Sequence, residues 1–230
     1  MNRITIAIDG FSSTGKSTLA KQLAKELGYV YVDTGAMYRA VTLFAIRHGH
    51  IGGERSNGEA LVKLLPNIKL HFEYNDDLGY SEMYLNGENV EKEIRGMDVS
   101  KHVSHVAEIE QVRYKLVEQQ KEMGKEKGVV MDGRDIGTVV FPDAELKIFM
   151  TASPQKRAYR RYKELLDRGE TVTYADILEN VEKRDYIDSH RAASPLKKAE
   201  GAIVFDNSDM GLKEQFERIH NYALRIIAKT

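Results

Sequence analysis

The stretch IAIDGFSSTGKST, residues 6–18, decides the fold of this chain. An apolar segment of strand character runs into a loop of small residues, which ends in Lys-Ser-Thr. The spacing of Gly10, four residues, Gly15, Lys16 and Ser17 is that of a phosphate-binding loop between a strand and a helix. Backbone N–H groups of such a loop form an anion-binding nest, and the following helix adds its positive N-terminus. We therefore predict that the chain binds a nucleoside triphosphate.

The segments on either side of this loop support the prediction. Isoleucines at every second position precede it, and leucines at every fourth position follow it. Lys16 can reach the β- and γ-phosphates, and the Ser17 hydroxyl can bind Mg²⁺. We expect ATP to contact the loop residues Gly10, Phe11, Ser12, Ser13, Thr14, Gly15, Lys16, Ser17 and Thr18.

Composition narrows the class of protein. The 230 residues, with 42% hydrophobic and 30% charged side chains, suit one α/β domain with an insertion. A net charge of −1 gives no sign of a nucleic-acid or membrane partner, and cysteine is absent. The first predicted strand begins at residue 4, so we expect no signal peptide. We expect a monomeric cytoplasmic protein that binds neither nucleic acid nor membrane.

Short apolar runs separated by helical patterns predict a doubly wound parallel sheet. The five expected strands are residues 4–9, 29–33, 129–132, 146–150 and 202–206. Helical periodicity predicts one long helix over 98–124 and a last helix over 211–228. The predicted fold class is α/β, with a five-stranded parallel P-loop sheet flanked by helices.

Residues 66–97 interrupt this alternation. The runs IKLHFEY and SEMYLNGENV predict two antiparallel strands joined by the turn NDDLG, and an NGE turn follows. We expect a core domain of residues 1–65 and 98–230, with 66–97 as a small inserted subdomain. Pattern alone leaves open whether the insert serves a second substrate or is a surface decoration.

Charged and polar residues follow two of the expected strands. Thr34 and Arg39 come after the second strand, and Asp132, Arg134 and Asp135 end the third. Ligands bind at the carboxyl ends of strands in open α/β sheets. These residues therefore predict a second ligand site beside the phosphate-binding loop.

Two further helices carry arginine and are joined by the loop GETVT. In segment 153–169, one helical face carries Arg157, Arg161 and Arg168. In segment 181–196, one face carries Arg184, Asp188 and Arg191. One interpretation is a pair of exposed helices with local ion pairs. The other is a helical lid over about 153–191 that closes over phosphates and excludes water. The phosphate-binding loop favours the lid.

In these motifs the chain resembles the bacterial cytidylate (CMP) kinases, a family of nucleoside monophosphate kinases. The resemblance covers essentially the whole chain and includes the hairpin insert. Its most specific segments are DTGAMYR (33–39), EIRGMDVS (93–100), DGRDIGTVVFPDA (132–144) and KRDYIDSHR (183–191). The resemblance implies transfer of a phosphoryl group from ATP to CMP or dCMP, giving ADP and CDP or dCDP, with Mg²⁺.

The resemblance also implies roles for single residues. Residues expected to bind CMP are Thr34, Arg39, Arg134 and Arg191 near its phosphate, Ser104, Arg113 and Asp135 at the cytosine edge, and Arg184 and Asp188 near the ribose. Residues expected to act on the transferred group are Lys16, Arg134, Arg157 and Arg161, with Arg157 and Arg160 also contacting ATP. The segment FDNSD, 205–209, lies where related kinases hold adenine, mostly by backbone contacts. Either Asp132 or Asp33 orients Mg²⁺ through water.

The expected reaction is an in-line attack by a CMP phosphate oxygen on the γ-phosphorus of ATP, without a general base.

The nearest alternative enzymes are a UMP/CMP kinase, an adenylate kinase and a shikimate-type kinase. An adenylate kinase is expected to carry DGFPR where this chain has DGRDIG. A GTPase switch needs N-K-x-D, and FDNSD lacks the lysine.

A metal site at His102 and His105 is a further alternative. It lacks a third ligand at a convincing spacing, so surface histidines are the favoured interpretation.

Overall fold

The structure, a computed structural model, describes residues 2–52 and 55–230. Its internal contacts divide the chain into two compact units, Met1–Asp33 with Gln120–Thr230, and Thr34–Gln119. The expected insert, 66–97, lies within the second unit, which also contains residues 34–65 and 98–119. Its boundaries as a separate subdomain stay a prediction.

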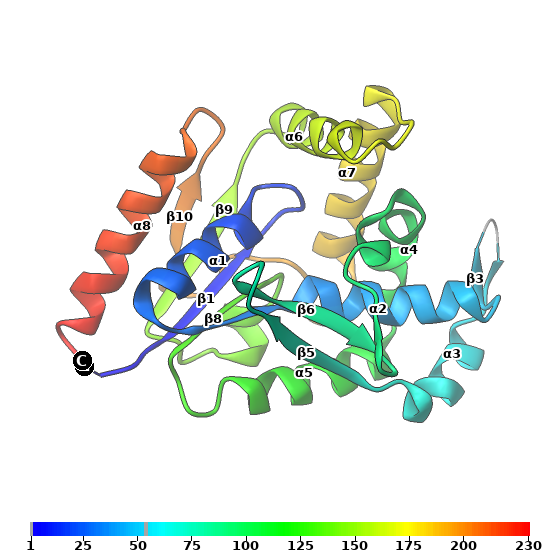
Figure 1. The fold of residues 1–230 in the computed structure, drawn as a ribbon, viewed down its shortest axis with the longest axis horizontal. Helices are drawn as coiled ribbons and strands as arrows, with labels where there is room; N and C mark the ends of the chain where they lie inside the picture. Colours follow the sequence, from blue (N-terminus) through cyan, green and yellow to red (C-terminus); the bar gives the residue numbers. More distant parts are fainter. Residues whose placement is uncertain (1, 53–54) are drawn as a thin grey trace. The chain divides into compact units, whose positions relative to one another are not determined.

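The first unit is built on the five-stranded parallel sheet that the apolar runs predict (Figure 1). Its strands are β1 (Thr5–Gly10), β2 (Val30–Asp33), β8 (Val129–Gly133), β9 (Leu146–Thr151) and β10 (Ile203–Asp206), in the order β10-β9-β1-β8-β2. Every residue of β1 is buried, as expected for a central strand with helices on both faces. Because all five strands are parallel, their carboxyl ends share one edge of the sheet.

Four α-helices belong wholly to this unit: α1 (Lys16–Leu27), α6 (Pro154–Asp167), α7 (Tyr174–His190) and α8 (Leu212–Ile227). α8 lies beside α1, and leucines of α1 pack with Ile219 of α8 and Ile6 of β1 in one apolar cluster (Figure 1). The expected last helix, 211–228, is therefore confirmed. A single π-helical turn, Ile136–Val140, follows β8.

The arginine-bearing segment 181–196 is only partly helical, so the expectation of one helix over that range is wrong. α7 begins earlier, at Tyr174, where Thr173 Oγ1 accepts a hydrogen bond of 3.2 Å from the N–H of Asp176. It ends at His190, and Ser194 has a φ of 50°. Pro195 disfavours helical backbone at Ser194, so a helix could not continue through the whole of the expected range.

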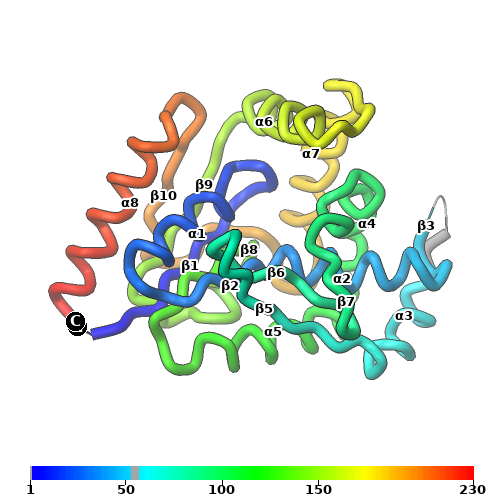
Figure 2. Tube along the Cα trace, in the orientation of Figure 1, coloured from blue at the N-terminus to red at the C-terminus, as the bar shows by residue number. Residues whose placement is uncertain are grey.

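The described residues of the second unit form helices and two small antiparallel sheets, one of two strands and one of three. Its elements are α2 (Thr34–Arg47), β3 (Ile51–Gly52), β4 (Arg55–Ser56), α3 (Gly58–Leu64), β5 (Leu70–Asn75), β6 (Tyr80–Leu85), β7 (Glu88–Asn89) and α4 (Met97–Glu108), with 3₁₀ turns at Leu65–Asn67 and Glu93–Arg95. The tube in Figure 2 follows β5, β6 and β7, which pair in that order. The expected hairpin is confirmed, and the Asn86–Gly87 turn has positive φ at both residues.

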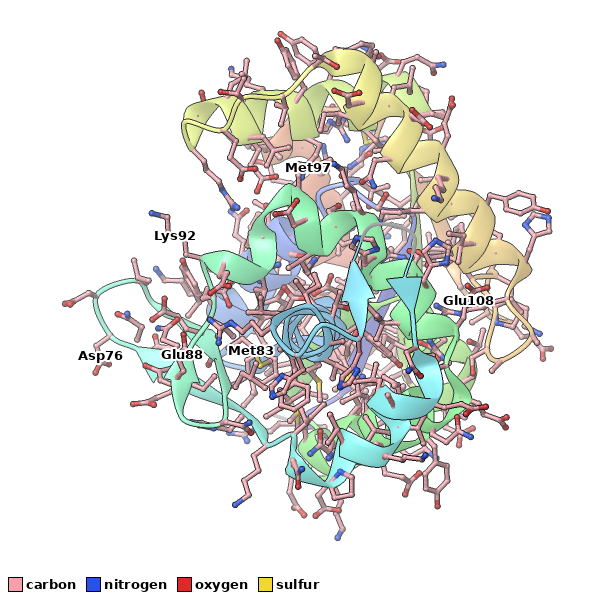
Figure 3. The ribbon with its side chains drawn as sticks, turned by 90° about the vertical axis from the view of Figure 1, so that its right-hand side faces the viewer. Asp76, Met83, Glu88, Lys92, Met97 and Glu108 are labelled. Atoms are coloured by element: carbon pink, nitrogen blue, oxygen red, sulfur yellow. The ribbon has the colours of Figure 1, made fainter. Side chains whose placement is uncertain are left out.

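Side chains of the hairpin separate into a buried and an exposed set. Met83 of β6 is fully buried against the apolar cluster of this unit, whereas Asp76 at the hairpin tip is exposed (Figure 3). Within β6, Met83 and Leu85 are buried and Tyr84 between them is only half-buried, which is the alternation expected of an antiparallel sheet with one face on a core. The hairpin is thus part of the packed core of the second unit.

The single helix expected over 98–124 is wrong. Two helices occupy this range, α4 and α5 (Glu110–Met123), and Ile109 between them has extended backbone with φ −68° and ψ 113°. The break lets Ile109 pack against the apolar cluster of the second unit. It also creates a new helix start, at which Glu110 complements the helix dipole.

No helix within residues 2–52 and 55–230 has both the length and the hydropathy required to cross a membrane.

Candidate active site

The loop between β1 and α1 has the tight geometry that its glycines predict. Gly10 has a φ of 148°, and a Cβ there would lie 2.0 Å from the Met150 carbonyl oxygen, so only glycine fits. Gly15 has a φ of 88°, and Ser13 is left-handed at 58°. The loop therefore turns sharply just before the first residue of α1.

Lys16 is buried within the unit and faces back over the loop. Its Nζ donates hydrogen bonds to the Phe11 carbonyl oxygen at 2.5 Å and to Thr14 Oγ1 at 3.4 Å. Burial, and then the nearby positive charge of Arg134, lower the pKa of Lys16, while Asp132 and Asp9 act to raise it. A bound polyphosphate would favour the charged ammonium form of Lys16. Binding of the β- and γ-phosphates by Lys16 requires that form.

Ser17 and Asp132 are brought together by the parallel pairing of the sheet. Ser17 Oγ donates a hydrogen bond of 3.1 Å to Asp132 Oδ2, and the Tyr31 hydroxyl donates one of 2.8 Å to Asp132 Oδ1. Burial, and then the neighbouring carboxylate of Asp33, raise the pKa of Asp132 to about 6. A hydroxyl beside carboxylates is an all-oxygen donor set, which suits a hard cation such as Mg²⁺.

A cluster of arginines surrounds Asp188 near the end of α7. Arg134 Nε donates to Asp188 Oδ2 at 2.8 Å, and Arg191 Nη1 lies 3.8 Å from Asp188 Oδ1. Burial acts to raise the pKa of Asp188, but Arg134, Arg184 and Arg191 outweigh it and hold that pKa below its usual value. Asp188 thus faces three guanidinium groups, which are donors suited to oxyanions, and Asp185 and Asp132 also act on Arg134.

Arg191 itself lies at the end of α7, not on its face as expected. Its Nε and Nη2 donate to the Ser194 carbonyl oxygen at 3.0 and 2.8 Å, which is possible because the chain turns away from the helix here. The N–H of Leu196 donates to the Asp188 carbonyl oxygen at 2.7 Å and closes the turn. The chain after α7 therefore turns back to Asp188, and Arg191 lies at the start of this turn.

The three arginines of α6 differ in their surroundings. Arg157 is 2% exposed, forms an ion pair of 2.5 Å with Asp185 of α7 and donates to the Ser12 carbonyl oxygen at 3.1 Å. Arg161 forms an ion pair of 2.9 Å with Glu164 on the same helix. Arg157 therefore contacts the phosphate-binding loop from its carbonyl side. Direct contacts of Arg157 and Arg161 with a nucleotide stay predictions.

Arg160 also contacts the loop through its carbonyl groups. Its Nη2 donates to the Asn207 carbonyl oxygen at 2.7 Å, and its Nη1 lies 3.1 Å from Asn207 Oδ1 and 3.4 Å from the Thr14 carbonyl oxygen. Asn207 Nδ2 donates to the Thr14 carbonyl oxygen at 2.7 Å, so the segment FDNSD, expected to hold adenine, supplies a side chain that reaches the loop. The adenine contact stays a prediction.

Asp9 is a buried residue of this site that sequence reasoning missed. Its two carboxylate oxygens accept hydrogen bonds of 2.8 Å from the N–H of Ile136 and 2.7 Å from the N–H of Gly137. These bonds fix the turn that follows Asp135, which is itself 2% exposed. The only sequence signal was a carboxylate at the end of a central strand. Burial raises the pKa of Asp9 to about 7, against the effect of the two N–H bonds.

Four residues expected on the acceptor side belong to the second unit. Thr34 and Ser104 are buried at the start of α2 and within α4, and Arg39 is half-buried one turn after Thr34. The Arg113 guanidinium lies 5.3 Å from the ring centre of Tyr38 and donates to the Ala107 carbonyl oxygen at 3.1 Å. The other expected acceptor residues belong to the first unit, so one common pocket stays a prediction.

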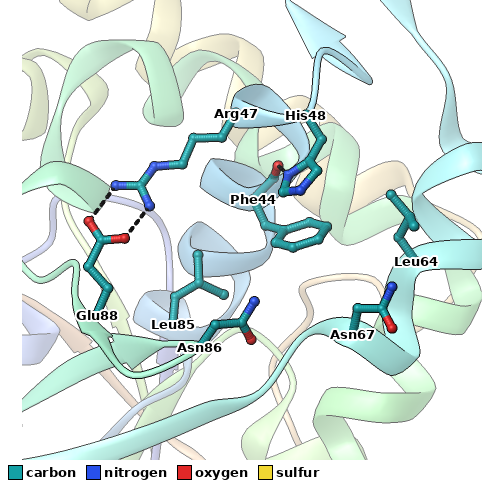
Figure 4. Close-up of a pocket in the computed structure, with 8 residues that line it drawn as sticks. All are labelled: Phe44, Arg47, His48, Leu64, Asn67, Leu85, Asn86 and Glu88. Atoms are coloured by element: carbon teal, nitrogen blue, oxygen red, sulfur yellow. Dashed lines mark hydrogen bonds and ion pairs between the residues drawn. The ribbon is translucent and has the colours of Figure 1, made fainter.

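A separate pocket of about 310 Å³ lies wholly within the second unit (Figure 4). Phe44 and His48 stack at 3.9 Å, and Arg47 forms a bidentate ion pair with Glu88 at 2.6 and 2.8 Å. The rest of its lining is Leu64, Asn67, Leu85 and Asn86. None of these residues was expected in the active site.

Histidine and carboxylate residues do not gather into a metal centre in the described ranges. Among residues 2–52 and 55–230, no group of three or more His, Cys, Asp or Glu is placed to hold a metal ion. His105 instead lies 3.4 Å from Glu108 on its own helix. A Mg²⁺ ion bound at Ser17 would take further ligands from the nucleotide and from water.

Comparison with known proteins gives extensive similarity in sequence. The family model described as "Cytidylate kinase" matches residues 6–225. A cytidylate kinase of Flavobacterium johnsoniae is 65% identical over 219 residues, which cover 95% of each chain. A cytidylate kinase of Parabacteroides distasonis is 60% identical over 215 residues, which cover 94% of each chain.

Solved structures give weaker similarity. A gluconokinase of Sinorhizobium meliloti aligns with a TM-score of 0.46 and 16% identity, covering 99% of this chain and 94% of that one. A shikimate kinase of Bacteroides thetaiotaomicron aligns with a TM-score of 0.46 and 12% identity, covering 99% of both chains. At these values neither protein bears on the substrate of this chain.

Proposed function

The chain belongs to the cytidylate kinase family, and we propose on this basis how its residues divide between a phosphoryl donor and a nucleotide acceptor. It is a nucleoside monophosphate kinase, which transfers the γ-phosphoryl group of ATP to CMP or dCMP and gives ADP and CDP or dCDP. The observation that carries the proposal is the pairing of a phosphate-binding loop with the arginine cluster around Asp188 in the same unit.

The donor site is the loop 10–15 with the start of α1. Its N–H groups and the positive helix end bind the triphosphate of ATP, and Lys16 reaches the β- and γ-phosphates. Arg157 and Arg160 support this site through the loop carbonyl groups, and Arg157 and Arg161 add positive charge near the transferred group. The adenine is held by the segment 205–209 through backbone contacts.

The proposed acceptor residues are the arginine cluster of the first unit and four residues of the second unit. Arg134 and Arg191, together with Thr34 and Arg39, bind the phosphate of CMP. The cytosine edge is recognised by Ser104, Arg113 and Asp135, and the ribose lies near Arg184 and Asp188. A carboxylate and a guanidinium match the amine donor and the O2 and N3 acceptors of cytosine. Uracil would present a carbonyl to the carboxylate and leave buried polar groups mismatched.

The proteins of this class catalyse transfer mainly by positioning and by charge stabilisation. A phosphate oxygen of CMP is already anionic near neutral pH, so its in-line attack on the γ-phosphorus needs no general base. Lys16 and Arg134, whose charges interact in the structure, stabilise the negative charge that the two phosphates bring together. Helices α6 and α7 exclude water when they close as a lid.

Mg²⁺ is part of the proposal, held by the Ser17 hydroxyl and, through water, by Asp132. The hydrogen bond of 3.1 Å between these two side chains favours Asp132 over Asp33 for this role. When bound, the ion neutralises charge on the β- and γ-phosphate oxygens. We also propose that the enzyme acts as a cytoplasmic monomer, without a nucleic-acid or membrane partner.

Transfer of label tests this function. The purified protein is incubated with Mg²⁺, CMP and ATP labelled in its γ-phosphate, and the nucleotides are separated. We expect the label in CDP, and only when CMP is present. Release of the label as inorganic phosphate at the same rate with and without CMP would contradict the proposal and indicate a hydrolase.

A further inference from the structure

We infer that Asn207 is a positioning residue, whose side-chain amide fixes the orientation of the phosphate-binding loop from the side opposite its N–H groups. Asn207 follows β10 and is 0% exposed. Its Nδ2 donates a hydrogen bond of 2.7 Å to the Thr14 carbonyl oxygen, across 193 positions of sequence. The inference rests on the donor site proposed above and adds a residue to it.

The peptide between Thr14 and Gly15 shows why this contact matters. In a trans peptide the C=O and the following N–H point in opposite directions. A donor that holds the Thr14 carbonyl therefore also sets the direction of the Gly15 N–H, at a residue with a φ of 88°. Gly15 is the N-cap residue of α1, immediately before Lys16, in the loop that is expected to form the anion-binding nest.

Other carbonyl groups of the loop are held in the same way. The Phe11 carbonyl accepts from Lys16 Nζ and from Thr14 Oγ1, and the Ser12 carbonyl accepts from Arg157 Nη1. Side chains from α6 and from the segment after β10 thus hold the Ser12 and Thr14 carbonyl groups, and the N–H groups in the same peptide planes, those of Ser13 and Gly15, face away from these donors. The loop is preorganised for an anion before any nucleotide binds.

The orientation of the Asn207 amide is itself determined by two neighbours. Its Nδ2 also donates to Gln215 Oε1 at 2.8 Å, and its Oδ1 accepts from Arg160 Nη1 at 3.1 Å. Gln215 is 3% exposed and is oriented in turn by a bond of 2.8 Å from its Nε2 to the Met210 carbonyl oxygen. The amide cannot flip without losing its bonds to Arg160 and Gln215, so it always presents a donor to Thr14.

This geometry separates the side chain of Asn207 from the adenine contact expected of its segment. The amide is fully buried, and its nitrogen and oxygen are both hydrogen-bonded to protein, so it does not contact the nucleotide directly. Its effect on ATP is indirect and acts through the loop. If the amide only stabilised the fold, its replacement would lower stability and leave nucleotide affinity unchanged. Nucleotide affinity therefore distinguishes a positioning role from a structural one.

The test uses Asn207→Asp in the full chain, because aspartate keeps the shape and replaces the donor by an acceptor. Dissociation constants for ATP and for CMP are measured by calorimetry, with the melting temperature recorded. We expect the dissociation constant for ATP to rise at least tenfold and that for CMP to stay within twofold. Ile219→Val, the loss of one buried methyl group on α8, is the control that lowers stability without altering ATP affinity.

Two results would overturn the inference: ATP affinity within twofold of the unchanged protein, or equal losses for ATP and CMP. If Asn207→Asp does not fold, Gln215→Leu decides, because it removes the acceptor that orients the amide. We expect at least a threefold loss of ATP affinity there, and no loss would overturn the inference. Failure of the unchanged protein to bind ATP or to phosphorylate CMP would instead contradict the proposed function itself.

Discussion

The Ser17 hydroxyl donates a hydrogen bond of 3.1 Å to the Asp132 carboxylate, although the two residues lie 115 positions apart in the sequence. Ser17 is the second residue of α1, and Asp132 lies near the carboxyl end of β8, the strand paired with β1. The parallel sheet therefore joins the phosphate-binding loop to the segment DGRDIG, which the family resemblance connects with the acceptor.

Lys16→Met is expected to reduce kcat/KM by roughly 10²–10³-fold, since it removes one charged group from the phosphate site. Methionine can occupy the buried position, so circular dichroism should still show the native fold. Steady-state kinetics measure the effect. Lys25→Met, on an exposed position of the same helix, is the matched control and should leave the rate unchanged. A rate for Lys16→Met within tenfold of the unchanged protein would disprove the phosphate role.

Asp135→Ala and Arg113→Met are expected to raise the KM for CMP at least tenfold while the KM for ATP changes less than twofold. Each change leaves a polar group of cytosine without its partner, and such losses act on one substrate only. Initial rates at varied CMP and at varied ATP separate the two effects. Asp143→Ala, at an exposed position, serves as the control. Equal increases for both substrates would show that the division into donor and acceptor residues is wrong.

Much of the fold was predictable because its signals are local. All five sheet strands, the hairpin and the last helix follow from periodicity, and the loop from its glycines. The break at Ile109 was not predictable, since neither proline nor glycine marks it and only packing against the core of the second unit accounts for it.

The candidate site was predictable where residues follow a strand and not where partners are distant. Arg134 and Asp188 were expected near each other only through the family resemblance, and they form a bond of 2.8 Å. The contacts of Asn207 with Thr14 and of Arg157 with Asp185 depend on where α6, α7 and β10 pack. No sequence spacing encodes such packing.

The buried carboxyl of Asp9 makes stability depend on pH. Its pKa is about 7 in the folded protein and about 4 in an unfolded chain, so the folded state holds a proton that the unfolded state lacks between these values. The stabilisation is complete below pH 4 and is lost as pH rises through 7. We expect the free energy of unfolding to fall between pH 5 and 8 more steeply than in Asp9→Asn, by on the order of 2 kcal/mol. Urea denaturation at both pH values measures this difference, and equal slopes would show that Asp9 is ionised throughout.

Closure of α6 and α7 predicts a change in hydrogen exchange. Addition of ATP and CMP together should slow exchange of backbone N–H groups within residues 153–191, because the lid becomes ordered over the phosphates. Helix α8 (Leu212–Ile227), which takes no part in closure, is the internal reference. Identical exchange of 153–191 with and without both nucleotides would count against a lid.

The most direct test of the central claim is a coupled assay of ADP release with CMP, dCMP, UMP, AMP, GMP and shikimate as acceptors. A site that pairs Asp135 and Arg113 with cytosine should give CMP or dCMP the highest kcat/KM, at least about 10²-fold above AMP, GMP and shikimate. If AMP or shikimate is the best acceptor, or if ADP is released equally without any acceptor, this chain is not a cytidylate kinase in function.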